Sequence, residues 1–125
     1  MPKEEGYVED AMLDYEEGTQ FIAQKLPRLM RKYQAFTDTC FTKGKLAVKD
    51  KQLMALAVSV ALRDEYCILS YTKACIDENC TDSEILEAVS VAAAFCPAPA
   101  MSQAATLIRD ALDTFESQDK EEASE

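Results

Sequence analysis

Hydrophobic residues recur every three to four positions along most of the chain, from near residue 7 to near residue 117, which is the spacing of amphipathic helices. The first such stretch carries Val8, Met12, Tyr15, Phe21 and Ile22. A second helix begins near Pro27, because proline is well tolerated in the first turn of a helix, and Gly44 marks its end. No alternating pattern typical of β-strands competes. The pattern therefore predicts an all-α fold with about six helices.

The most hydrophobic segment, residues 49–62, is apolar almost all round, which predicts a central helix buried on most sides. Asp64 fits the N-cap of the next helix, which we expect to run to about residue 79. Thr81 and Glu84 have the residue types and the spacing of a capping box. This pair predicts a further helix that ends near residue 95.

Two prolines interrupt the helical pattern after residue 95. Because a residue before proline avoids the α region, we expect Cys96 and Ala98 outside a helix and the last helix to begin at Pro99. From residue 117 onward the chain is polar and acidic. We therefore expect a single all-α domain over residues 1–116 and a disordered acidic tail over residues 117–125.

The composition limits the class of protein and the chemistry that the chain can carry out. The 125 residues are 48% hydrophobic with three glycines, so the chain suits one domain with an ordinary core. The sequence contains no histidine, which excludes His-based acid–base catalysis, His-ligated zinc and nucleophiles activated by histidine.

The net charge of −10 arises at the two ends, because residues 1–17 and 113–125 hold more than half of the 23 acidic residues. Such acidity disfavours nonspecific binding to nucleic acid or to an anionic membrane. No segment approaches the roughly 18 apolar residues of a membrane-spanning helix, and the polar start of the chain does not resemble a signal peptide. We therefore expect a cytoplasmic protein that binds neither nucleic acid nor membrane.

Five cysteines, Cys40, Cys67, Cys75, Cys80 and Cys96, are expected to be reduced thiols in such a protein. The closest pair, Cys75 and Cys80, is separated by four residues, and no second pair or histidine completes a zinc site. The sequence therefore predicts no metal and no other cofactor.

Of the five cysteines, Cys67 has the position that most clearly indicates a chemical role. If Asp64 is the N-cap, Cys67 lies in the first turn of its helix, where the free N–H groups and the helix dipole favour a thiolate. Asp64 and Glu65 oppose this effect by like-charge repulsion. Tyr71 and Ser70, one turn further on, can approach the sulfur atom. The alternative is that Cys67 is a small buried hydrophobic residue, as free cysteines usually are.

The segments 45–57, 63–71 and 81–95 resemble the AhpD-like, or carboxymuconolactone decarboxylase, superfamily. Typical members read K-x-K-E-L-x-A-L-A, then C-x-x-C-x-x-x-H, then A-T-D-E-E-I-x-E-A, and the spacing from Lys49 to Ala88 matches without gaps. The resemblance covers about residues 36–112. It implies an all-helical protomer that assembles into trimers or hexamers, with an active site at the start of the C-x-x-C helix.

In the peroxidase-type members of that superfamily, the second cysteine attacks the peroxide, the first resolves the sulfenic acid, and a glutamate and a histidine relay protons. Cys67 has the attacking position, whereas Asp64, Tyr71 and Gln52 have the resolving, histidine and glutamate positions. Aspartate cannot form a disulfide, so the usual dithiol cycle is closed unless Cys40, Cys75, Cys80 or Cys96 approaches Cys67. Cys75 lies about 12 Å from Cys67 along the helix, too far to bridge within an intact helix. Gln52 and Tyr71 can hydrogen-bond but cannot relay protons near pH 7.

Three hypotheses follow. In the first, Cys67 is the nucleophile of a one-cysteine peroxide reductase, Tyr71 and Gln52 orient the peroxide, and an external thiol is the reductant. In the second, catalysis is lost, and an oligomeric scaffold binds a peroxide-like or lactone-like small molecule, or a protein partner through its acidic ends. In the third, Asp64 and Glu65 are acid–base groups for a lactone or carbonyl substrate. The apolar segment 49–62 also leaves more hydrophobic surface than one small core hides, which predicts a homo-oligomer.

Overall fold

The computed structural model describes residues 6–124, and every regular element within this range is a helix. The helices are α1 (Tyr7–Lys25), α2 (Pro27–Cys40), α3 (Val48–Leu62), α4 (Glu65–Asp77), α5 (Asp82–Ala93), α6 (Pro97–Gln103) and α7 (Arg109–Ser124). A π-helical segment, η1 (Ala104–Ile108), joins α6 to α7, so that residues 97–124 form one continuous helix. The predicted all-α fold of about six helices is confirmed.

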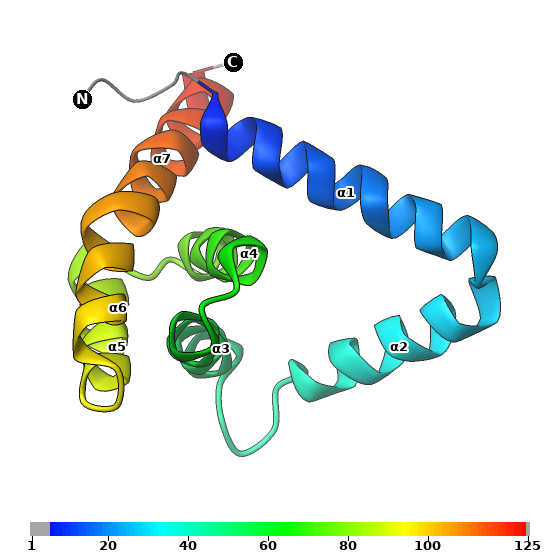
Figure 1. The fold of residues 1–125 in the computed structure, drawn as a ribbon, viewed down its shortest axis with the longest axis horizontal. Coiled ribbons are helices and arrows are strands. Elements are labelled where there is room, and N and C mark those ends of the chain that lie inside the picture. Colours follow the sequence, from blue (N-terminus) through cyan, green and yellow to red (C-terminus); the bar gives the residue numbers. More distant parts are fainter. Residues whose placement is uncertain (1–5, 125) are drawn as a thin grey trace.

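Helices α3 and α4 lie side by side at the centre of a compact body, with α5 and the α6–α7 helix packed along one side (Figure 1). The core contains completely buried side chains from these elements, namely Leu56, Ile68, Leu69, Ile85 and Ile108. Val8 is also buried, which fixes the first turn of α1 to the body. The body therefore holds the start of α4, where Cys67 lies, in a rigid position.

The first half of α1 passes over α4, its second half runs away from the body, and α2 returns beside the loop that leads into α3 (Figure 1). The elbow lies at Leu26, which precedes Pro27 and leaves the helical region at φ −131°, as a residue before proline tends to do. No residue of α2 is buried. We call residues 13–40 the arm; several of its large hydrophobic side chains, including Phe21, Leu29 and Phe36, are exposed.

The predicted helix starts at Asp64 and Thr81 are both confirmed. The side chain of Asp64 caps α4 by accepting a hydrogen bond from the N–H of Cys67. At α5 the two hydrogen bonds of the capping box are present: Glu84 N–H donates to Thr81 Oγ1 at 3.1 Å, and Thr81 N–H donates to Glu84 Oε1 at 2.9 Å. These caps set where α4 and α5 begin.

Three local expectations were wrong. The last helix begins at Pro97 rather than Pro99, and Ala98 is helical, because two prolines can share a first turn whose N–H groups have no intrahelical partner anyway. Residues 117–124 continue α7 as a helix instead of being disordered. One side of α3 is also exposed: Val58 and Leu62 are 56% and 74% accessible, so the protomer alone does not bury this helix on most sides.

Within residues 6–124, no helix combines the length and the hydrophobicity that crossing a bilayer requires.

Candidate functional site

Cys67 is the third residue of α4, and its backbone N–H donates a hydrogen bond to Oδ1 of Asp64 at 3.1 Å. Its side chain is half-buried rather than sealed in the core. The structure therefore confirms the prediction that Cys67 lies in the first turn of a capped helix. This position brings the thiol close to free backbone N–H groups, but also close to a carboxylate.

The surroundings of Cys67 favour the protonated thiol. Burial raises the pKa of Cys67, and the negative charge and hydrogen bonding of Asp64 raise it further. The effect of Asp64 is the like-charge repulsion expected from the sequence, whereas Glu65 does not contribute to it. Cys67 is consequently a thiol that needs either a higher pH or a substrate-bound state to ionise.

Three tyrosines fix α1 over the first turn of α4. The hydroxyl of Tyr7 donates a hydrogen bond to Oε1 of Glu65, and the hydroxyl of Tyr66 donates to Oδ2 of Asp14 at 3.0 Å. The rings of Tyr15 and Tyr66 stack with their centroids 5.8 Å apart. Both residues that directly precede Cys67 are thus held by α1, so α1 forms a wall beside the thiol.

Tyr71 lies one turn after Cys67 on α4 and is half-buried. Its ring stacks on Phe41, at the base of the arm, with the centroids 5.5 Å apart. Burial raises the pKa of Tyr71, and electrostatic interactions with Cys67, Tyr33 and Tyr15 raise it further. The hydroxyl therefore stays protonated at neutral pH and is available as a hydrogen-bond donor.

Tyr15 and Tyr33 are site residues that the sequence analysis did not identify. Burial raises the pKa of Tyr15, followed by electrostatic interactions with Cys67 and Tyr33. Tyr15 stacks on Tyr66, the residue before Cys67, and Tyr71 follows Cys67 by one helical turn. Together with Tyr33, which interacts electrostatically with both Tyr15 and Tyr71, Cys67 and these two tyrosines are called the thiol–tyrosine cluster. Tyr15 and Tyr33 follow the ordinary hydrophobic spacing of α1 and α2, so only the fold of the arm reveals their proximity to the thiol.

Gln52 lies in the second turn of α3, and its Oε1 atom is buried without a hydrogen-bond partner among the described residues. An unpaired buried acceptor costs about 1–3 kcal/mol, so such atoms are rare unless a ligand or solvent donor serves them. No hydrogen bond joins Oε1 of Gln52 to the thiol–tyrosine cluster. Cys67, Asp64 and Tyr71 thus belong to α4 and its cap, and Gln52 is an unsatisfied acceptor on α3, the helix packed against α4.

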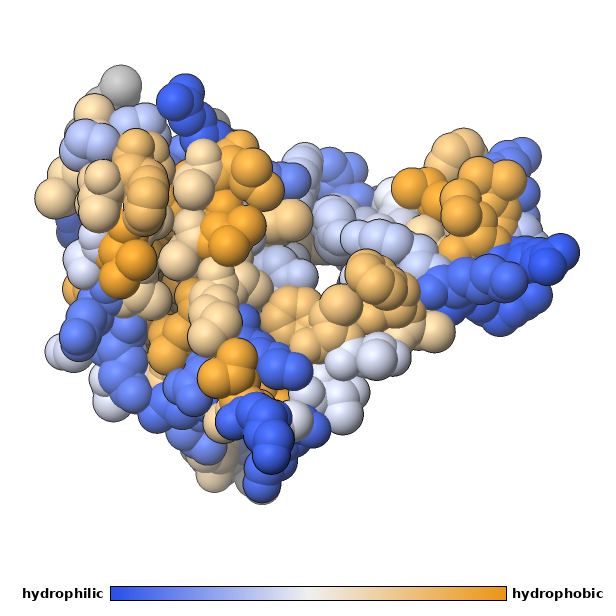
Figure 2. Space-filling model, turned by 90° about the horizontal axis from the view of Figure 1, so that it is seen from below, coloured by the Kyte–Doolittle hydropathy of each residue, from blue (hydrophilic) through white to orange (hydrophobic). Residues whose placement is uncertain are grey.

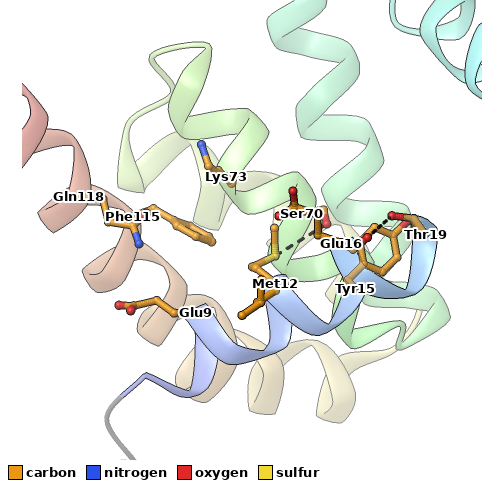
Figure 3. Close-up of a pocket in the computed structure, with 10 residues that line it drawn as sticks. Glu9, Met12, Tyr15, Glu16, Thr19, Ser70, Lys73, Phe115 and Gln118 are labelled. Carbon is orange, nitrogen blue, oxygen red and sulfur yellow. Dashed lines mark hydrogen bonds between the residues drawn. The ribbon is translucent and has the colours of Figure 1, made fainter. Parts of the chain in front are cut away.

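Ser70, which was expected to be able to approach Cys67, has a different partner in the structure. The hydroxyl of Ser70 does not serve Cys67 but faces Sδ of Met12 at 4.0 Å. It lines a groove of about 540 Å³ between α1, α4 and α7, whose walls also include Tyr15, Lys73 and Phe115 (Figure 3). Tyr15 belongs both to this groove and to the thiol–tyrosine cluster, whereas Cys67 does not line the groove. No group of three or more potential metal ligands gathers anywhere in residues 6–124.

Known proteins resemble this chain in sequence and in fold. A profile of the carboxymuconolactone decarboxylase family matches residues 27–110, which include α2 to η1 and Cys67. A search of curated protein sequences found no match.

Two solved proteins share the fold. A carboxymuconolactone decarboxylase family protein from Legionella pneumophila superposes with a TM-score of 0.79 at 22% sequence identity, covering 90% of this chain and 96% of that one. A protein of the same family from Thermotoga maritima, whose description suggests involvement in an antioxidative response, gives a TM-score of 0.71 at 23% identity, with 90% and 93% covered. A second crystal structure of this Thermotoga protein gives a TM-score of 0.74, also at 23% identity, with 93% and 98% covered. At these identities the similarity establishes the fold.

Proposed function

The chain belongs to the carboxymuconolactone decarboxylase family, and we propose that it is a thiol-dependent hydroperoxide reductase whose nucleophile is Cys67. The observation that carries this proposal is a half-buried thiol at the start of α4, with Tyr71 one helical turn further on and Tyr15 stacked on the adjacent Tyr66. The antioxidative response suggested for the Thermotoga protein of the same fold supports this direction.

The proposed reaction uses one cysteine of the chain. The Cys67 thiolate attacks the terminal oxygen of a hydroperoxide, the O–O bond breaks, and the alkoxide leaves as an alcohol after taking a proton. The sulfur is then a sulfenic acid. A small external thiol attacks this sulfur and releases water, and a second external thiol displaces Cys67 from the mixed disulfide. Each cycle reduces one hydroperoxide and oxidises two external thiols to a disulfide.

Each residue near Cys67 has a distinct role in this proposal. Tyr71, whose raised pKa keeps it protonated, donates a hydrogen bond to the leaving oxygen. Tyr15 helps to position the peroxide from α1. Asp64 caps the helix and holds Cys67 in place, but its charge limits the thiolate at neutral pH. Cys75 lies two turns further along the same helix and cannot reach Cys67, so the proposal assigns the resolving step to an external thiol.

Consumption of a hydroperoxide in the presence of a small dithiol tests this proposal. Wild-type protein and Cys67→Ser are compared, with Cys96→Ser as the control because Cys96 is also half-buried and lies outside α4. We expect Cys67→Ser to lose the consumption and Cys96→Ser to keep it. Equal rates for wild type and Cys67→Ser would overturn the proposal.

A second candidate function is small-molecule binding without turnover. It is favoured by the unpaired Oε1 atom of Gln52, which offers a buried acceptor to a ligand with a hydroxyl or hydroperoxyl group. The raised pKa of Cys67, due first to burial, points the same way. A hydroxylated lactone that stabilises wild-type protein against heat but not Gln52→Leu, with no chemical conversion, would favour this candidate. The hypothesis that Asp64 and Glu65 are acid–base groups has less support, because both carboxylates already accept hydrogen bonds.

We also infer that the chain acts as a homo-oligomer. The arm exposes Leu29, Tyr33 and Phe36 by 57–67%, and the body exposes Val58 and Leu62 on α3. Hydrophobic side chains gather at the far end of the arm and on the face of the body that is turned toward the viewer in Figure 2. Apolar surface of this extent is typical of protein interfaces. An arm that packs on a second copy would also enclose the thiol–tyrosine cluster, because Tyr33 belongs to the arm.

A further inference from the structure

A second pair of cysteines lies away from the thiol–tyrosine cluster. Cys75 is in the last turn of α4 and is completely buried, whereas Cys80 lies between α4 and α5 and is half-buried. A backbone hydrogen bond joins the two residues. The function proposed above uses neither residue.

The end of α4 explains why the two thiols meet. Asn79 has the left-handed conformation with φ 62°. The N–H of Cys80 donates to the carbonyl oxygen of Cys75, and the N–H of Asn79 donates to that of Ile76, both at 2.9 Å. These are the two hydrogen bonds of a Schellman motif, whose first and last residues bring their side chains into contact. In most proteins this contact is hydrophobic, but here both positions are cysteines.

We propose that Cys75 and Cys80 form a second redox centre, a dithiol that closes to an intramolecular disulfide when a hydroperoxide oxidises Cys80. The backbone hydrogen bond between the two residues keeps their Cα atoms as close as a disulfide requires. Cys80 meets the oxidant because it is the exposed member of the pair, and Cys75 needs only to reach Cys80.

The charges around Cys75 and Cys80 also favour Cys80 as the thiol that reacts with the oxidant. Burial raises the pKa of both thiols, and that of Cys75 reaches about 12. At Cys80 the positive charge of Lys49 and the interaction with Cys75 lower the pKa, whereas the negative charges of Glu84 and Glu78 add to the rise. The pKa of Cys80 is therefore raised, but less strongly than that of Cys75. Lys49 also forms an ion pair with Glu84 at 2.8 Å, so its ammonium group is held at this end of α5. Cys80 is therefore the thiol that ionises and reacts first.

The reaction balances with the hydroperoxide as the only oxidant. The Cys80 thiolate attacks the peroxide oxygen and becomes a sulfenic acid, while the alkoxide leaves as an alcohol after protonation. The Cys75 sulfur then attacks Cys80, the S–O bond breaks, and the departing hydroxide takes the Cys75 proton and leaves as water. The product is a disulfide that joins the end of α4 to the residue before the α5 capping box.

Mass spectrometry of the full chain after treatment with excess hydrogen peroxide, followed by alkylation, tests the proposal. Trypsin leaves Cys75, Cys80 and Cys96 on one peptide, because no Lys or Arg lies between Lys73 and Arg109. A second cleavage at glutamates cuts between Cys80 and Cys96 and also at Glu78, so each of the three cysteines lies on its own fragment. We expect the fragments with Cys75 and Cys80 to stay joined by a disulfide, two hydrogen atoms lighter than their sum and without alkylation. An alkylated Cys75 beside a reduced or overoxidised Cys80 would overturn the proposal.

Single substitutions test which cysteine carries out each step of the proposed disulfide formation. Cys75→Ser should leave a sulfenic acid on Cys80 that dimedone traps, and Cys75→Ala provides the same test if the hydroxyl is not tolerated in the core. Cys96→Ser is the matched control and should form the disulfide like the wild type. Cys67→Ser should also form it. If Cys67→Ser abolished the disulfide, the pair would be a relay for Cys67, and its independence would be refuted whatever the outcome for peroxide turnover.

Discussion

Asp64 holds Cys67 in place and at the same time opposes its ionisation. Oδ1 of Asp64 accepts the backbone N–H of Cys67 at 3.1 Å, and the carboxylate adds to the effect of burial in raising the pKa of the thiol. One side chain therefore serves the fold by capping α4 and restrains the chemistry proposed at its first turn. A neutral N-cap would keep the start of α4 and remove the negative charge that opposes ionisation of Cys67.

Asp64→Asn should increase the reactivity of Cys67. Asparagine is as good an N-cap as aspartate, so α4 keeps its start, while the negative charge beside the thiol disappears. We expect Cys67 to be alkylated several-fold faster at pH 7, as measured by site-resolved mass spectrometry. Glu65→Gln is the control, because Glu65 does not contribute to the pKa of Cys67 and glutamine can still accept the Tyr7 hydrogen bond. An unchanged rate in Asp64→Asn would show that burial alone controls the thiol.

Tyr71→Phe should slow peroxide reduction without unfolding the protein. Phenylalanine keeps the ring that stacks on Phe41 but removes the hydroxyl proposed to donate to the leaving oxygen. We expect a loss of roughly tenfold or more in turnover, since a positioned donor contributes at least that much to such reactions. The melting temperature should stay close to that of the wild type. Full activity in Tyr71→Phe would remove this residue from the proposed mechanism.

Glu116 predicts a pH dependence of stability. Its pKa is raised to about 7, first by a hydrogen bond to Asp82 and then by burial and the charge of Asp82. Because the folded chain binds this proton more tightly than the unfolded one, the stabilisation is complete below the ordinary value of 4.5 and is lost as the pH rises through 7. Glu116→Gln should therefore flatten the melting temperature between pH 4.5 and 7.

At pH 8 we expect Glu116→Gln to melt higher than the wild type, by about 1–4 °C. Glu122→Gln is the control, since Glu122 is exposed further along the same helix. Parallel melting curves against pH for wild type and Glu116→Gln would show that the interaction between Glu116 and Asp82 has no effect on stability.

Phe36→Asp should dissociate the proposed homo-oligomer. Phe36 is 67% exposed on α2, and a carboxylate there would be costly to bury against a second copy. Analytical ultracentrifugation should show an assembly for the wild type and for the polar control Gln24→Glu. Phe36→Asp should sediment as a protomer of 13.9 kDa. A wild type that already sediments as a monomer would contradict this inference.

Local signals in the sequence predicted the helices well, because caps and prolines act within a few residues. Pro27, Asp64 and the Thr81–Glu84 pair each mark the start of a helix in the structure. Pro97 and Pro99 were harder to interpret, since either proline can begin a helix and only the packing of α6 on α5 decides which one does. The acidic end of α7 was expected to be disordered because its composition, taken alone, hides its continuity with a packed helix.

The site was predictable only where it lies on one element. Cys67, Asp64 and Tyr71 belong to α4 and its cap, so helical spacing alone brought them together. Tyr15 and Tyr33 come from α1 and α2, and their approach to Cys67 depends on the course of the arm, which no local signal encodes. The Cys75–Cys80 contact depends on the left-handed residue Asn79, whose role at the helix end is visible only in the backbone.

Trapping of sulfenic acid at Cys67 tests the central claim most directly. The wild-type chain is treated with a limiting amount of hydroperoxide in the presence of dimedone over a range of pH, and each cysteine is quantified by mass spectrometry. We predict that Cys67 carries the adduct and that its labelling increases with pH, because its raised pKa limits the thiolate at neutral pH. A Cys67 that stays an unmodified thiol at every pH, while the folded protein is retained, would contradict the assignment of Cys67 as the reacting group.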